Sequence, residues 1–144
     1  MKDPNLTMAE KVALAAQDFQ QKQTGHLPKA VTVVLSGDTL VITLHEALTP
    51  AERALSKTPE GAARVQDFHR QLFAGSARSL RQKIKRITGV EVREAIAEVE
   101  TATGTVVQVF TSGTMVQVYQ LARGIPAKTW NGRALPRKAR RSRR

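Results

Sequence analysis

Two proline-containing helix starts, placed nine residues apart between Asp38 and Val65, constrain the fold more than any other part of the sequence. In Thr49–Glu52 (TPAE), the threonine side chain can accept a hydrogen bond from the backbone NH of the glutamate, and the glutamate side chain can reach back to close a capping box. The proline presets φ at the first helical position. Thr58–Glu60 repeats the threonine–proline start. The preceding run Val41–Leu44 is typical of a strand that lies on a core. The segment therefore predicts a strand, a short helix and the start of a second helix.

The remaining segments predict further helices and strands on either side. The spacing of apolar residues predicts a helix from a capping box at Thr7 and Glu10 to Gln23, and a long helix from Pro59 to about Ile87. Extended apolar patterns predict strands at 30–35, 90–100, 105–110 and 114–121. The strand at 90–100 is expected to contain a bulge near Glu94. The expected fold is α+β and two-layered, in the order helix, hairpin, two helices and antiparallel meander.

Two of these predicted strands resemble each other. Val106–Phe110 reads VVQVF and Met115–Tyr119 reads MVQVY, with matching glutamines and a Thr-Ser-Gly turn between them. The pattern predicts two arms of one hairpin.

Charge is distributed unevenly along the chain. The segment 123–144 holds nine basic residues and no acidic one, so it supplies +9 of the net charge of +11. We therefore expect residues 1–122 to form one nearly neutral domain, and residues 123–144 to form a disordered basic tail. The chain has no cysteine, no signal-peptide pattern and no apolar run long enough to span a bilayer, which indicates a cytoplasmic protein.

The residue types that carry catalysis are not clustered in the sequence. His26, His45 and His69 show no metal-ligand spacing, and there is no phosphate-binding glycine loop, so we expect no enzyme activity, no metal and no cofactor.

One acidic cluster leaves two alternatives open. The glutamates in question lie in or beside one predicted strand, at positions Glu91, Glu94, Glu98 and Glu100. They could form an acid–base pair or hold a cation, or they could simply be a solvated strand face.

A candidate anion pocket lies at the base of the predicted hairpin. Lys29, His45 and Arg53 could meet there, beside the helix end at Gly25 and Pro28. The alternative is that this glycine and proline form an ordinary helix C-cap with no ligand.

The strongest candidate for direct contact with a partner is the basic tail. Its cations could bind polyanions through Arg133, Arg137, Lys138, Arg140, Arg141, Arg143 and Arg144. Trp130 could stack on a base, sit at a lipid interface, or fold back on the domain. The alternative is a solubilising tail with no fixed partner.

Several motifs resemble those of one bacterial family, the MpsC (YbcI-like) family. They are TGHLPK at 24–29, LTPAE at 48–52, KTPEG at 57–61, ITGVEV at 87–92 and TGTVVQVF at 103–110. The resemblance covers roughly Thr7 to Phe110, with His26 and Leu27 where the family commonly has arginine and glycine. It implies a two-layer α+β domain and an accessory role beside an integral membrane ion or inorganic-carbon transport system that generates membrane potential.

Together, these observations favour a non-enzymatic accessory or regulatory protein. The long helix and an exposed sheet edge suggest a homodimer, and the basic tail suggests a peripheral position at the inner face of the membrane, on anionic lipid. The alternative is a nucleic-acid-binding protein that acts through its tail.

Overall fold

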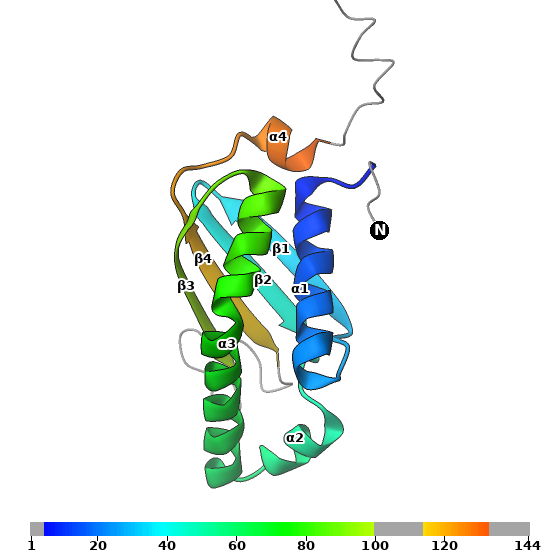
Figure 1. The fold of residues 1–144 in the computed structure, drawn as a ribbon. Helices are drawn as coiled ribbons and strands as arrows, with labels where there is room; N and C mark the ends of the chain where they lie inside the picture. Colours follow the sequence, from blue (N-terminus) through cyan, green and yellow to red (C-terminus); the bar gives the residue numbers. More distant parts are fainter. Residues whose placement is uncertain (1–4, 100–113, 133–144) are drawn as a thin grey trace, which may run out of the picture.

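The fold is a four-stranded antiparallel sheet with two long helices side by side on one face (Figure 1). The computed structural model describes residues 5–99 and 114–132. In chain order the elements are α1 (Met8–Thr24), β1 (Ala30–Ser36), β2 (Thr39–His45), α2 (Pro50–Leu55), α3 (Pro59–Thr88), β3 (Val92–Val99), β4 (Met115–Leu121) and α4 (Ala127–Asn131). The predicted α+β class is confirmed.

The predicted helix starts form as the sequence indicates. The backbone NH of Glu10 donates to Thr7 Oγ1 at 3.0 Å, and that of Glu52 donates to Thr49 Oγ1 at 3.1 Å. In both cases the glutamate carboxylate accepts from the cap residue's own NH, which completes the capping box. Thr58 caps α3 by accepting from the NH of Gly61. α2 therefore begins a few residues after the end of β2, and α3 begins a few residues after the end of α2.

The sheet order is β1-β2-β4-β3, so β4, the last of the described strands, lies in the interior of the sheet. β4 pairs with β2 along one edge and with β3 along the other. The predicted hairpin partner of β4, Val106–Phe110, lies outside the described residues, and both edges of β4 are taken by other strands. The predicted bulge is present but lies between Val92 and Glu94, slightly earlier than expected.

The core lies between the inner face of the sheet and the two long helices. Alternate residues of β2 and β4 are buried there, namely Leu40, Ile42, Leu44, Met115, Gln117, Tyr119 and Leu121. The two long helices contribute Val12, Ala16, Val65, Leu80 and Ile84 to the same cluster. The strict alternation of burial along the strands follows from the opposite directions of successive side chains in a pleated sheet.

The other face of the sheet carries a row of β-branched residues. The strand registers align Val34 with Val41, and Val41 with Val118. Val34 is 53% exposed, and the described helices lie on the opposite face (Figure 1). A row of valines facing away from the helices is an apolar surface that a partner could bury.

One end of the edge strand β3 is covered by an arginine from α3. Arg81 Nη2 donates to the carbonyl oxygens of Val92 and Arg93, at 2.9 and 3.0 Å. These two carbonyls lie at the bulge, where the pairing of β3 with β4 shifts its register. The arginine therefore bonds to the strand at the place where that pairing is irregular. Bulges and charged side chains of this kind discourage unwanted pairing at sheet edges.

The first part of the predicted disordered tail is folded, which corrects the boundary expected at residue 122. Ala127–Asn131 form α4, and Trp130 is only 6% exposed, in the same core cluster as Val12 of α1. The backbone NH of Leu121 donates to Asp38 O, and that of Ala122 donates to Glu91 O, which fixes the approach to α4. The physical reason is the apolar area of the indole, whose burial outweighs the polar composition around it.

Tyr119 is a buried ionisable residue in the core. Its hydroxyl donates to Gln117 Oε1 at 2.7 Å, and burial raises the pKa of its phenol well above the ordinary value of 10.0. The unfolded chain therefore releases this proton at a lower pH than the folded chain. We expect the free energy of unfolding to fall above about pH 10, by up to about 1.4 kcal/mol per pH unit from this residue.

Tyr119→Phe tests this expectation by urea unfolding at pH 8 and at pH 11. Near neutral pH the variant is expected to lose about 1 to 2 kcal/mol, because Gln117 loses its donor. Between the two pH values, its stability is expected to fall less steeply than that of the parent chain. An equal fall in both proteins would mean that Tyr119 does not contribute to the alkaline loss.

Candidate functional site

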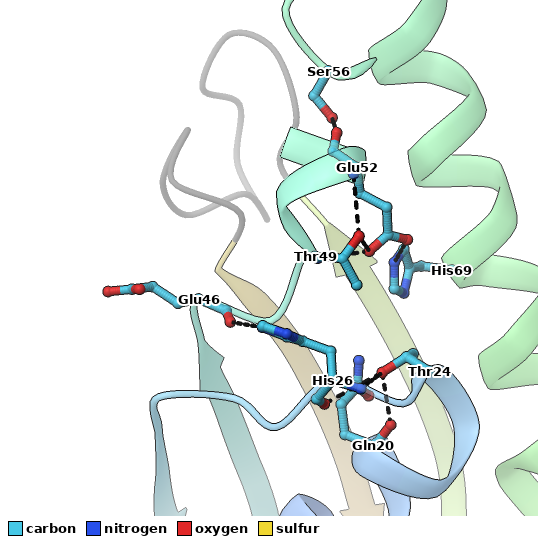
Figure 2. A network of polar contacts seen from close by, with 8 residues as sticks. All are labelled: Gln20, Thr24, His26, Glu46, Thr49, Glu52, Ser56 and His69. Atoms are coloured by element: carbon cyan, nitrogen blue, oxygen red, sulfur yellow. Dashed lines mark hydrogen bonds and ion pairs between the residues drawn. The ribbon is translucent and has the colours of Figure 1, made fainter. Parts of the chain in front are cut away.

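Polar side chains meet where the end of α1, the end of β2, α2 and α3 come together (Figure 2). On the α1 side, Thr24 Oγ1 donates to Gln20 O at 2.9 Å and accepts from the NH of His26 at 3.1 Å. Gly25 between them has φ 76°, a left-handed conformation that suits glycine as a helix C-cap. The helix end thereby turns His26 toward β2.

His26 connects this turn to the end of β2. Its Nε2 atom lies 3.0 Å from Glu46 O and donates there, because a carbonyl oxygen can only accept. Glu46 itself has φ 52°, which is unusual for a residue other than glycine. The histidine bond therefore stabilises the sharp turn that redirects the chain from β2 toward α2.

The second part of the network joins α2 to α3 through one carboxylate. Glu52 Oε1 accepts from the NH of Thr49 at 2.9 Å, while Glu52 Oε2 lies 2.8 Å from His69 Nε2 (Figure 2). His69 is 3% exposed. Glu52 thus closes the N-terminal cap of α2 and also bonds to the buried imidazole of His69. It thereby links the start of α2 to α3.

A close backbone contact completes the α2–α3 junction. A Cβ atom at Gly61 would overlap the carbonyl of Leu55, the last residue of α2. Only glycine allows the first turn of α3 to lie this close to α2. The glycine of KTPEG is therefore explained by packing.

Of the predicted anion-site residues, Arg53 faces an open hollow while the other two point elsewhere. The hollow has a volume of about 440 Å³ and is lined by His26, Glu46, Leu48, Pro50, Arg53, Ala54 and Lys57. Lys29 Nζ lies 3.5 Å from Glu46 Oε2, beside this lining. His45 Nε2 lies 3.0 Å from Thr32 Oγ1, across the β1–β2 pair. The structure therefore places His26 and Lys57, rather than His45, with Arg53.

The hollow combines three potential cations with one carboxylate. His26, Arg53 and Lys57 lie around the apolar side chains of Leu48 and Pro50, and Glu46 belongs to the same lining. Such a surface could hold a small anion with an apolar part. Anion binding at this place stays a prediction.

The predicted acidic cluster is spread along β3 and its approach. Glu91 pairs with Lys85 at 2.7 Å, both largely exposed, and Glu94 is exposed. The sheet register places Glu98 opposite Val116, and Glu100 lies outside the described residues. Glu91 and Glu94 thus fit the alternative of a solvated strand face. Within residues 5–99 and 114–132, no group of three or more His, Cys, Asp or Glu side chains could hold a metal ion.

The polyanion-binding residues predicted from Arg133 to Arg144 all lie outside the described part of the chain. Trp130 lies within it and is folded back on the domain, which was one of its three predicted positions. No helix among the described residues is long and apolar enough to cross a membrane.

Sequence reasoning did not find the pairing of Glu52 with His69. The signal was present in part, because His69 follows Val65 at helical spacing on the apolar side of α3, which indicates a buried histidine. A buried histidine needs a hydrogen-bond partner, but nothing in the spacing indicates which carboxylate lies across the α2–α3 turn.

Comparison with known proteins identifies the family. A family model described as "Na+-translocating membrane potential-generating system (MpsC)" matches residues 5–113. No curated protein and no solved structure matches the chain. The matched region includes the whole network of Figure 2, from the helix end at Thr24 to His69 on α3. With most of its length covered by the match, the chain belongs to the MpsC family, which is named for a membrane system that translocates Na⁺ and generates a membrane potential.

Proposed function

We propose that this protein is a non-enzymatic accessory or regulatory component of a membrane ion-transport system, bound to an integral membrane subunit at the inner face of the membrane. The observation that carries the proposal is the family match over residues 5–113, since the family is named for such a system. A folded domain without a spanning helix among its described residues would reach that system by binding a membrane-embedded partner.

The use of the polar side chains supports a non-enzymatic role. Glu52 caps α2 and holds His69, and His26 holds the carbonyl of Glu46. Each of these groups is engaged in a bond that joins secondary-structure elements. A general base or nucleophile needs instead to face a substrate within hydrogen-bond reach.

Crosslinked purification of the tagged full-length chain from its own cells, membranes included, tests the proposal. Recovery of an integral membrane transport subunit, together with a loss of Na⁺-dependent membrane potential in cells lacking the protein, would support it. Recovery of nucleic acid or nucleic-acid-binding proteins alone would overturn it. The matched control is the chain ending at residue 132, which keeps α4 and buried Trp130 and lacks only the strongly basic end.

A second candidate function is nucleic-acid binding through the basic end. Residues 133–144 carry seven basic residues and no acidic one, which is the observation that favours it. Full-length protein and the 1–132 control can be titrated against duplex DNA and against vesicles containing anionic lipid. Binding through this segment should vanish in the control and weaken by roughly a thousandfold between low and physiological salt for DNA. Tight binding to vesicles but not to DNA would favour the membrane role.

The valine row on the outer face of the sheet supports the further proposal of a homodimer. Val34, Val41 and Val118 lie in register across three strands, and two copies could bury their rows against each other. Val34→Lys is expected to shift the protein toward monomer in sedimentation experiments. Leu14→Lys on α1 is the matched control, because Leu14 is 52% exposed on a helix rather than on the sheet. Dissociation by the control, or by neither variant, would contradict this interface.

A further inference from the structure

A small polar cavity lies within the domain, where α1, α3 and β4 meet. It offers about 20 Å³ to a water molecule and shares none of its described lining residues with the hollow beside Arg53. The described polar residues of its lining are Gln20 and Gln23 from α1, His69 and Ser76 from α3, and Gln117 from β4. A buried site can hold one water molecule when it has roughly 10 to 15 Å³ of such space and at least two polar partners. The cavity meets both conditions.

Gln20 presents to this cavity a hydrogen-bond donor that has no protein partner. The residue is 7% exposed, and its Nε2 atom has no hydrogen-bond partner within residues 5–99 and 114–132. Its backbone carbonyl accepts from Thr24 Oγ1 at 2.9 Å, which holds this part of α1 in place. Buried polar groups are nearly always bonded, either to protein or to ordered water. The amide therefore indicates a bound molecule that can accept a hydrogen bond.

Gln117 contributes a second donor, and this donor is only weakly bonded. Its Oε1 atom accepts from the Tyr119 hydroxyl at 2.7 Å, whereas its Nε2 atom lies 4.0 Å from Met115 Sδ. A thioether sulfur is a weak acceptor. The amide of Gln117 can therefore also donate to a molecule in the cavity.

Ser76 supplies an acceptor from the facing helix. Its hydroxyl donates to Leu72 O at 2.8 Å, so its proton is used and its lone pairs are left to accept. A molecule that accepts from two amides and donates to one hydroxyl has the hydrogen-bonding pattern of water. A cation would meet the two amide donors, and an anion would lose its hydration without a proton to give to the serine.

We propose that one water molecule is bound in this cavity and joins α1 to β4 and α3. It accepts from Gln20 Nε2 and Gln117 Nε2, and it donates to Ser76 Oγ. Three hydrogen bonds are the usual number for a buried water. The water thereby completes the bonding of two buried amides that the protein groups leave incomplete.

The bound water also bears on the network at the candidate site. Among the residues drawn in Figure 2, the bonds around Thr24 and His26 and the bonds between Glu52 and His69 form two separate groups. Gln20 belongs to the first group through its carbonyl, and both Gln20 and His69 line the cavity. The water therefore links α1 to α3 directly behind the place where the two groups face each other.

A high-resolution crystal structure of the full-length chain tests the site directly. We expect an ordered water about 2.7 to 3.2 Å from the side-chain amide of Gln20, bonded also to Gln117 and Ser76. Gln20→Met is expected to lose this water and keep the fold, because methionine fills a similar space and carries no donor. A parent structure without this water, or with a protein group bonded to the amide in its place, would overturn the proposal.

Thermal unfolding supplies a second measurement, whose sign separates the alternatives. With the water bound, Gln20→Met is expected to lower the Tm by about 3 °C, because the water loses a partner. If the amide had no partner, methionine would raise the Tm by removing an unsatisfied buried donor. The matched control is Gln21→Met, since Gln21 is exposed on the same helix, and it is expected to change the Tm by less than about 1 °C. A Tm for Gln20→Met at or above that of the control contradicts the bound water.

A double-mutant cycle separates a bridging water from local packing. Gln20→Met and Ser76→Ala act on the same water, so the double variant is expected to lose less stability than the sum of the two single variants. The control cycle pairs Gln20→Met with Ser79→Ala, because Ser79 is exposed on α3 and is not part of the described lining. The control cycle is expected to be additive. Additivity in both cycles would show that no water bridges Gln20 to Ser76, and the proposal would fail.

Discussion

Gly61→Ala is expected to lower the free energy of unfolding by about 2 to 3 kcal/mol, although alanine is the better helix former. The added Cβ would overlap the carbonyl of Leu55, and a backbone atom cannot move aside as the end of a long side chain can. The first turn of α3 would have to shift away from α2. That shift would disturb the N-cap of α3, because Thr58 Oγ1 would no longer accept a hydrogen bond from the backbone NH of residue 61.

The matched control is the same substitution in the same helix. Gly75 lies in the interior of α3, is exposed, and has no atom within 4 Å of the position of a Cβ. Gly75→Ala is therefore expected to stabilise the protein by about 0.5 to 1 kcal/mol. Thermal and urea unfolding of the two variants should move in opposite directions. Two stabilised variants would show that α2 and α3 are not in close contact at Leu55.

Glu52→Ala is expected to cost about 2 to 4 kcal/mol, more than an ordinary helix cap. The Glu52 carboxylate accepts hydrogen bonds from the NH and the hydroxyl of Thr49, and their loss accounts for about 1 kcal/mol. The remainder comes from His69, which is buried and would lose the carboxylate that lies 2.8 Å from its Nε2 atom. Urea unfolding at neutral pH measures the total.

Glu52→Gln separates the two contributions. A glutamine at this position can still accept the NH of Thr49, so the cap is retained, and its amide can still bond to a neutral imidazole. We expect the glutamine variant to lose less than half as much stability as the alanine variant. A double-mutant cycle with His69→Ala would give the coupling between the two side chains. A coupling near zero would contradict the role assigned to the pair.

Local sequence patterns predicted those helices and strands that are determined by residues close together in the chain. The caps at Thr7 and Thr49, the hairpin of β1 and β2, and the length of α3 all formed as expected, because threonine, proline and periodic apolar residues act within a few positions. The bulge in β3 was anticipated to within two residues.

Features that depend on distant partners were not predicted. The place of β4 between β2 and β3 is a property of the whole sheet, and the similarity of 106–110 to 115–119 suggested a simpler hairpin. Trp130 was assigned to a disordered tail because its neighbours in the sequence are polar. The composition of this segment does not indicate that one indole side chain is buried in the core. Of the residues that line the hollow, the sequence pointed to Arg53 but not to His26 or Lys57, because the turn at Glu46 decides which side chains face it. Anion binding there stays a prediction.

The position of β4 also bears on how the protein is made. Since β4 is the last of the described strands along the chain and lies between two earlier ones, it cannot join β2 to β3 until Leu121 has emerged from the ribosome. At ordinary rates of translation, the helices and the β1–β2 hairpin would wait for seconds with their apolar faces exposed. A nascent chain of this design therefore needs its apolar faces shielded during that interval.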